Sequence, residues 1–123
     1  MNFKIDTREK FTVITPLSDF FSDNLTAEFL SITNRFKQNK INLVINFKNV
    51  VFINEQVIEQ IAALQQEFYE NKLSFVVCEI QQPVKTVLEK LELDDVFNIA
   101  PTETEAWDIV QMEEMERELL SDE

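Results

Sequence analysis

The stretch from Ile41 to Asn54, Ile-Asn-Leu-Val-Ile-Asn-Phe-Lys-Asn-Val-Val-Phe-Ile-Asn, decides the fold. Its first half, Ile41 to Phe47, is rich in β-branched residues and nearly continuously apolar, which is typical of a central strand covered on both faces. A second apolar run, Val50 to Ile53, leads to Asn54, a good helix N-cap residue. After it, apolar residues repeat at helical spacing at Ile58, Ile61, Leu64 and Phe68. The stretch therefore predicts a buried strand that leads into a helix starting at Asn54.

The residues before this stretch predict a hairpin and a helix. Phe3 to Asp6 and Phe11 to Ile14 alternate apolar and polar residues, as half-buried strands do, and the residues between them are polar. Pro16 ends the second strand. One apolar stripe on the following helix consists of Leu25, Phe29, Ile32 and Phe36. Asn24 is the expected N-cap of that helix.

The residues after the stretch continue the alternation of strands and helices. Leu73 to Cys78 is another buried strand, and Pro83 suits the first turn of a helix. Val96 to Ile99 predicts a last short strand, and a terminal helix begins at Thr102. The predicted order is β-β-α-β-α-β-α-β-α. This order indicates an α/β fold: a mostly parallel central sheet opened by a β-hairpin, with about four helices, in one domain covering residues 1–123.

Composition removes most kinds of catalytic chemistry. The chain has no His and no Gly, which excludes His-activated nucleophiles, His-ligated zinc and the glycine-rich phosphate loops. Its single cysteine, Cys78, is expected to be a small core residue. Carboxylate pairs such as Glu113 and Glu114 lie in a charge-rich helix without apolar surroundings to raise a pKa. We therefore expect no enzyme activity, no catalytic residues, no metal and no cofactor.

Charge and hydropathy limit the partners. The net charge is −12, so nucleic acid is a poor partner. The segment from Thr102 to Glu123 carries −8 of this charge. No apolar run approaches the length of a bilayer span, and residues Met1 to Asp6 lack the order of a signal peptide. We expect a cytoplasmic protein that associates with neither membranes nor nucleic acid.

Two segments carry a resemblance to a known family. Asn42 to Ile53 and Phe75 to Leu91, with Val96-Phe97 after them, resemble the central strand, next strand and following helix of STAS domains. These domains occur in anti-sigma factor antagonists and in sulfate transporter tails. The resemblance extends over nearly the whole chain and implies the same element order. It implies a binding function.

The family signature is altered in this chain. In STAS antagonists the apolar run is followed by Asp-Ser-Ser-Gly-Leu, and an anti-sigma kinase phosphorylates the first Ser, which releases the antagonist. Here the same positions are Asn54-Glu55-Gln56-Val57-Ile58. The resemblance makes Glu55 the equivalent of the phosphorylated serine, so a switch at this position does not carry over. The larger Val57 is expected to hinder a partner that approaches where the family has Gly.

Glu55 has two interpretations. A carboxylate at a helix N-terminus can act as a permanent mimic of phosphoserine, with one negative charge instead of nearly two. Alternatively, Glu55 only stabilises the first turn, as acidic residues commonly do. The sequence favours the second interpretation by base rate. Phosphorylation at Ser18, Ser22 or Thr26 instead is an alternative that the sequence leaves open.

Two further segments are candidate contact surfaces. Phe20 and Phe21 form either an exposed aromatic anchor or, as the favoured alternative, a pair of which one ring closes the core. In the terminal helix, Ala106, Ile109 and Val110 are expected to pack on the sheet. Beyond Met112 the apolar residues either dock on a partner's basic groove or belong to a solvated, fraying tail.

These features together predict a protein-interaction module of a bacterial sigma-factor or partner-switching pathway. It would bind a kinase-like or STAS scaffold protein through Asn54, Glu55 and Gln56, with Phe20 and Phe21 beside them. A second hypothesis is a structural scaffold, or a homodimer, that uses the sheet edge or the Phe20-Phe21 loop. A third, ranked lowest, is a small-ligand sensor, because high acidity and the lack of Gly disfavour phosphate-bearing ligands.

Overall fold

The computed structural model describes residues 2–121 and contains one mixed sheet. Its elements are β1 (Phe3–Thr7), β2 (Phe11–Pro16), α1 (Asp23–Gln38), β3 (Asn42–Asn46), α2 (Glu55–Glu70), β4 (Phe75–Cys78), α3 (Gln82–Lys90), β5 (Ile99–Ala100) and α4 (Glu103–Ser121). This order confirms the predicted order. The segment beyond Met112, for which the sequence leaves a fraying tail as one alternative, is helical to Ser121, and residues 122–123 lie outside the described residues.

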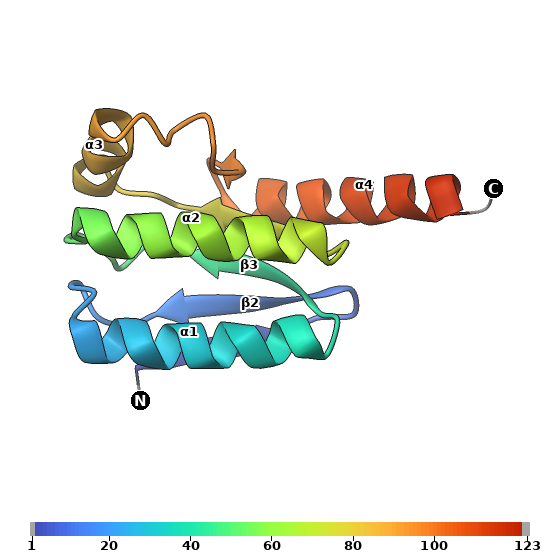
Figure 1. Cartoon of the computed structure of the whole chain (residues 1–123), viewed down its shortest axis with the longest axis horizontal. Helices are drawn as coiled ribbons and strands as arrows, with labels where there is room; N and C mark the ends of the chain where they lie inside the picture. Colours follow the sequence, from blue (N-terminus) through green and yellow to red (C-terminus); the bar gives the residue numbers. More distant parts are fainter. Residues whose placement is uncertain (1, 122–123) are drawn as a thin grey trace.

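The strands lie side by side in chain order, β1-β2-β3-β4-β5. Strands β1 and β2 form the antiparallel hairpin, and every later neighbour is parallel. Because parallel neighbours need crossover connections, α1, α2 and α3 each carry the chain from one strand to the next. Figure 1 shows α1 and α2 side by side in front of the strands and running along them, whereas α4 extends beyond the other helices towards the C-terminus.

The two faces of the sheet are covered by different helices. Leu43 and Ile45 of β3 pack in the larger core, which contains the buried residues of α1, α2 and α3. Val44, between them, belongs to a second core on the opposite face. That core consists of Phe11, Val13, Val44, Val76, Cys78, Ala100, Ala106 and Val110. Successive strand residues point to opposite faces, so the continuous apolar runs of β3 and β4 supply both cores. Packing of Ala106 and Val110 on the sheet is thereby confirmed.

Polar side chains hold the second half of α4 at the start of the parallel strands. Glu113 accepts hydrogen bonds from the hydroxyls of Tyr69 (2.8 Å) and Ser74 (2.6 Å) and from the side-chain amide of Asn98 (3.1 Å). One turn later, Arg117 donates to the Ser74 hydroxyl at 3.0 Å. Burial, more than the neighbouring Glu113 carboxylate, raises the pKa of Tyr69 to about 12. Tyr69 therefore stays protonated and donates to Glu113.

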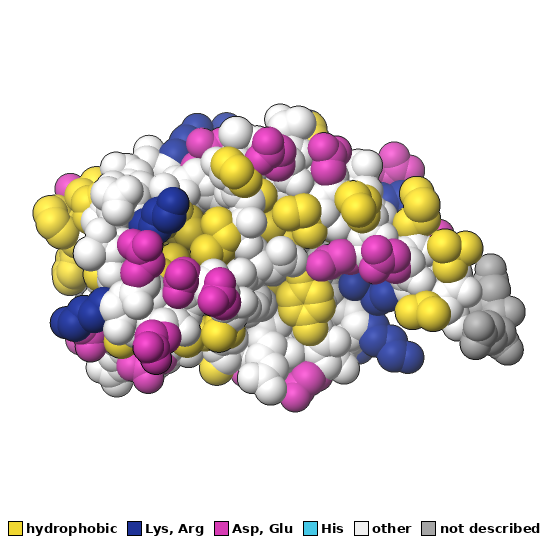
Figure 2. Space-filling view, turned by 90° about the horizontal axis from the view of Figure 1, so that it is seen from above, with side chains coloured by type: hydrophobic (Ala, Val, Ile, Leu, Met, Phe, Trp, Pro, Cys, Tyr) yellow, Lys and Arg dark blue, Asp and Glu magenta, His cyan; other side chains and the backbone are white. Residues whose placement is uncertain are grey.

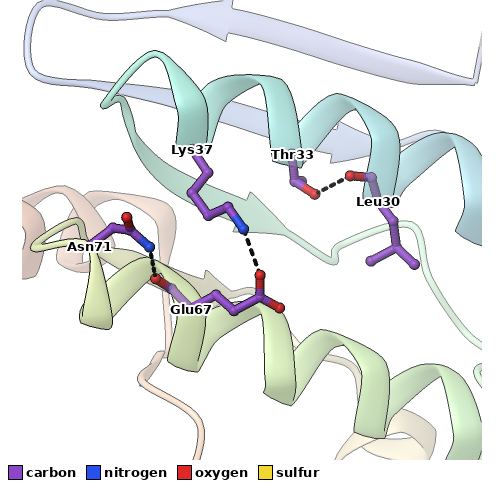
Figure 3. Close-up of polar contacts among 5 residues, drawn as sticks. All are labelled: Leu30, Thr33, Lys37, Glu67 and Asn71. Atoms are coloured by element: carbon purple, nitrogen blue, oxygen red, sulfur yellow. Dashed lines mark hydrogen bonds and ion pairs between the residues drawn. The ribbon is translucent and has the colours of Figure 1, made fainter.

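Helices α1 and α2 are joined on their outer side by an ion pair. Lys37 Nζ lies 2.5 Å from Glu67 Oε1. Figure 3 shows the two side chains pointing toward one another from the two helices. The Thr33 hydroxyl donates back to the carbonyls of Phe29 and Leu30, which satisfies this polar group inside the core. Asn71 donates its side-chain amide to the Glu67 carbonyl at 2.7 Å and so satisfies a carbonyl of the last turn of α2.

Three helices end in the same way without a glycine. Lys40, Lys72 and Glu92 follow the C-caps of α1, α2 and α3 and have φ of 60°, 61° and 58°. At α2, the Lys72 and Leu73 N–H groups donate to the Tyr69 and Phe68 carbonyls. These are the two hydrogen bonds of a Schellman motif, whose left-handed position is usually Gly. The corresponding bonds are present at the ends of α1 and α3.

Two sequence-based boundaries are wrong. The N-cap of α1 is Ser22 rather than Asn24, and its hydroxyl accepts from the Leu25 N–H at 3.2 Å. The helix starts early because Phe21, buried immediately before Ser22, brings the chain to the helix at that point. The last strand is Ile99–Ala100 rather than Val96–Ile99. Residues Val96 and Phe97 instead form a turn whose N–H groups donate to the Leu93 carbonyl.

We expect Glu113→Ala to lower the free energy of unfolding by about 2 kcal/mol, because three neutral donors lose a charged acceptor. Urea unfolding followed by circular dichroism measures the change. Asp108→Ala, on the exposed side of the same helix, is the matched control and should change stability by less than about 0.5 kcal/mol. Equal stability of the two variants would contradict the anchoring role of Glu113.

We expect Cys78 to resist alkylation in the folded protein. Burial, with a smaller effect of the Glu103 and Glu79 charges, raises the pKa of this thiol to about 12, so the reactive thiolate is scarce near neutral pH. At about pH 8, iodoacetamide should modify folded protein at least about a hundredfold more slowly than protein unfolded in guanidinium. Similar rates in both states, measured by intact mass, would show that the thiol is accessible.

Candidate protein-binding surface at the start of helix α2

Two loops meet at the end of the sheet where β2 and β3 finish. The Asp19 carbonyl accepts hydrogen bonds from the N–H groups of Val51 (2.8 Å) and Phe52 (2.9 Å). Phe21 N–H donates to the Phe52 carbonyl at 3.2 Å, and Phe20 and Phe52 form an isolated parallel bridge. Backbone hydrogen bonds therefore fix the loop before α1 against the loop before α2.

The start of α2 is capped as the sequence predicts. Asn54 has an extended backbone, and its side-chain oxygen accepts from the Val57 N–H at 2.9 Å. Glu55 is the first helical residue, and the side chains of Asn54, Glu55 and Gln56 are all exposed. The cap places the Glu55 carboxylate beside the free N–H groups and the positive end of the helix dipole.

Glu55 has a partner on a different helix. Its Oε1 lies 2.8 Å from Nζ of Lys90, in the last turn of α3, and both side chains are largely exposed. The hydrogen bond and the charge of Glu55 raise the pKa of Lys90 above its ordinary value. This ion pair joins the end of α3 to the start of α2. It also supports the simpler interpretation of Glu55, because an exposed ion pair contributes modestly to the fold without any partner.

The structure separates the two phenylalanines that the sequence placed together. Phe21 is fully buried and packs edge-on against Phe29 at 5.4 Å between ring centroids, so it closes the core and cannot contact a partner. This outcome corrects the inclusion of Phe21 among the binding residues. Phe20 is exposed to 48%, and Phe52, across the isolated bridge, is exposed to 59%. Phe20 and Phe52 are therefore the exposed apolar part of this end of the sheet.

The expectation for Val57 is also wrong. Its side chain is buried in the larger core, so it faces away from any partner and cannot hinder one. Sequence reasoning missed Phe52 and Lys90 as members of this surface. Phe52 was assigned to an apolar run leading into the helix, and the exposure of a single residue in such a run has no sequence signal. Lys90 comes near Glu55 only because the fold places the end of crossover helix α3 beside the start of crossover helix α2.

These elements bring together a set of exposed residues that we call the α2-start surface: Phe20, Phe52, Asn54, Glu55, Gln56 and Lys90. It combines two aromatic rings with one carboxylate, two amides and an ammonium group. Exposed aromatic rings surrounded by polar groups are typical of protein-binding surfaces. Within residues 2–121, no three potential metal ligands are grouped to hold an ion, and no helix is both long and apolar enough to cross a bilayer.

A mixed sheet entered by a hairpin, with three helices on one face and a C-terminal helix on the other, defines an α/β protein of the STAS type. The sequence matches the STAS domain over residues 2–106, and the chain belongs to that family. No curated protein matches it.

Solved structures share this fold at low sequence identity. A Thermotoga maritima protein assigned as an anti-sigma factor antagonist superposes with a TM-score of 0.79 at 17% identity, covering 89% of this chain and 94% of the other. The Bacillus anti-sigma factor antagonist SpoIIAA, in its unphosphorylated form, gives 0.72 at 18% identity over 89% and 96%. Moorella thermoacetica RsbS with a serine-to-glutamate substitution gives 0.62 at 18% identity over 90% and 96%.

We expect Asn54→Ala to destabilise the protein by about 1 kcal/mol, because the Val57 N–H loses its acceptor. Asn54→Asp should retain stability, since a carboxylate accepts the same bond and favours the helix dipole. Thermal unfolding measures both, and Gln56→Ala is the matched neighbour that should change little. A neutral Asn54→Ala variant would show that the cap does not contribute.

Proposed function

We propose that this protein is a non-catalytic, cytoplasmic interaction module of a sigma-factor or partner-switching pathway. It binds an anti-sigma kinase-like or STAS scaffold protein through the α2-start surface, without phosphorylation at the family position. One observation carries the proposal. The Glu55 carboxylate is exposed at the capped first turn of α2, where the family resemblance places the phosphorylated serine, and Phe20 and Phe52 lie exposed at the same end of the sheet.

The chemistry of Glu55 supports a fixed state rather than a switch. A glutamate carries one negative charge that no kinase or phosphatase changes, and it acts where helix N–H groups attract anions. RsbS with a glutamate in place of a serine also adopts this fold. In this proposal the protein still binds its kinase-like partner, but the fixed charge of Glu55 lowers the affinity below that of a variant with an uncharged hydroxyl at this position. The exposed rings supply the apolar contact area.

A charge variant tests the role of Glu55. Wild type, Glu55→Ser and the matched control Glu59→Ser, one turn along α2, serve as baits in the native cytoplasm. Quantitative mass spectrometry measures the recovered proteins. We expect Glu55→Ser to recover a kinase-like ATPase at least about tenfold better than the other two baits, because like charge and desolvation no longer oppose binding. Equal recovery by all three baits would leave Glu55 as a helix-start residue only.

The apolar part of the surface is tested separately with the recovered partner. We expect Phe52→Ala to weaken the purified complex about tenfold, as loss of an exposed aromatic anchor does. Titration calorimetry measures the affinity. Val96→Ala, at another exposed apolar residue outside the surface, is the control. An unchanged affinity with Phe52→Ala would place the contact elsewhere, such as the sheet edge required by a scaffold function.

A further inference from the structure

The two edges of the sheet differ in how they are protected. Strand β5 forms one edge and has only two residues. Figure 2, seen from above Figure 1, looks onto the side on which β5 lies and shows acidic side chains interspersed among apolar ones. Strand β1 forms the other edge with five residues, and within residues 2–121 no strand pairs with its outer side. Its pairing with β2 is regular, without proline or bulge, so β1 is the edge that can accept another strand.

Every second residue of β1 turns its backbone polar groups outward. The pairs at the two ends of the hairpin, Asn2 with Leu17 and Arg8 with Phe11, are hydrogen-bonded. Because hydrogen-bonded and non-hydrogen-bonded pairs alternate along an antiparallel ladder, the even-numbered residues of β1 bond to β2. The N–H and C=O groups that point away from β2 are therefore those of Phe3, Ile5 and Thr7.

The side chains of β1 alternate between the two faces. Ile5 lies opposite the buried Ile14 on the face of α1, is exposed to 45%, and borders a groove of about 440 Å³ between β1 and α1. Lys4 and Asp6 lie on the other face with their charges at the surface. Arg8 Nη2 lies 2.8 Å from Asp6 Oδ2, an exposed ion pair that uses one of the two carboxylate oxygens. The edge thus presents one apolar side chain flanked by a cation and an anion.

These charges select one way for two copies of β1 to pair. In an antiparallel pair centred on Ile5, Lys4 of each copy lies opposite Asp6 of the other. These are non-hydrogen-bonded positions, where opposite side chains come closest. A shift of two residues places Lys4 opposite Lys4 or Asp6 opposite Asp6, and a shift of one residue removes the backbone hydrogen bonds. The register centred on Ile5 is therefore the one that pairs every outward backbone group and opposes only unlike charges.

We propose that the protein forms a two-fold symmetric dimer in which the β1 strands of two copies pair antiparallel about Ile5 and join the two sheets into one. Phe3 of each copy exchanges backbone hydrogen bonds with Thr7 of the other, and Lys4 pairs with Asp6. The two-fold axis makes each of these contacts occur twice. The acidic helix α4 packs mainly over β3, β4 and β5, so the most negative element does not form this contact. None of these residues belongs to the α2-start surface, so the dimer does not depend on the function proposed above.

Sedimentation velocity of the full chain over about 1 to 500 µM tests the dimer. A five-residue edge buries little surface, so we expect a weak monomer–dimer equilibrium within this range. Ile5→Pro removes one outward N–H from each copy but no bond to β2, and should weaken association at least about tenfold. Circular dichroism verifies that the variant is folded. A wild-type monomer at every concentration, or a folded Ile5→Pro variant that associates like wild type, overturns the proposal.

Charge variants test the register. Lys4→Glu and Asp6→Lys each place like charges opposite one another in their own dimers, so each alone should associate about tenfold more weakly than wild type. Mixed in equal amounts, the two variants should recover much of the association as a heterodimer, because every contact again joins unlike charges. Lys10→Glu, in the β1–β2 turn outside the paired residues, is the matched control and should leave the dimer intact. A mixture that associates no better than its components overturns this register.

One more substitution distinguishes a contact through the C-terminal helix. Met115→Lys changes a side chain of α4 that is exposed to 61% and lies outside the paired strands. It should leave the dimer intact, because α4 does not take part in the edge contact. Loss of the dimer with Met115→Lys but not with Ile5→Pro would place the contact on α4 and overturn the proposal.

Discussion

Burial of β3 and β4 on both faces is the constraint from which the rest of the structure follows. The two strands present one set of apolar side chains to α1, α2 and α3 and another set to α4. Each apolar side chain kept from water contributes about 1.5–3 kcal/mol, so neither face can be left open in a domain of this size. The three crossover helices all lie on one face. The C-terminal helix must therefore cover the other, and its position follows from this requirement.

Helix α4 meets this requirement with only its first half. Val110 is its last fully buried apolar residue, and beyond it the helix passes the start of β3 and β4, where backbone and side-chain polar groups are partly enclosed. Glu113 satisfies the Tyr69, Ser74 and Asn98 donors there. The carboxylate that appeared to be part of a solvated acidic helix is thus a structural acceptor. The direction of α4 past the sheet is set by polar bonds, which leaves its apolar residues on the outside.

Sequence reasoning predicted the strands, helices and caps that follow from local residue patterns. It missed the features that depend on tertiary contacts. The strand at Asn42–Asn46 and the cap at Asn54 follow from local residue types, so both were predictable. For α1 the sequence predicts a cap at Asn24, whereas the chain enters the helix at Ser22, directly after the buried Phe21. For the α2-start surface, Asn54, Glu55 and Gln56 were identified from the family signature. Phe52 and Lys90 come from other segments, and nothing in the order of residues indicates that they lie near Glu55.

The glycine-free helix ends have a consequence for the unfolded chain. Lys40, Lys72 and Glu92 each hold a left-handed conformation that costs an L-residue about 1–2 kcal/mol. A chain without glycine, however, has fewer backbone states to lose when it folds. At the end of α2 the apolar pair Phe68 and Leu73, five residues apart, is buried beside the strained residue and helps to hold it. The protein therefore combines local strain in its folded state with a conformationally restricted denatured ensemble, and its net stability reflects both.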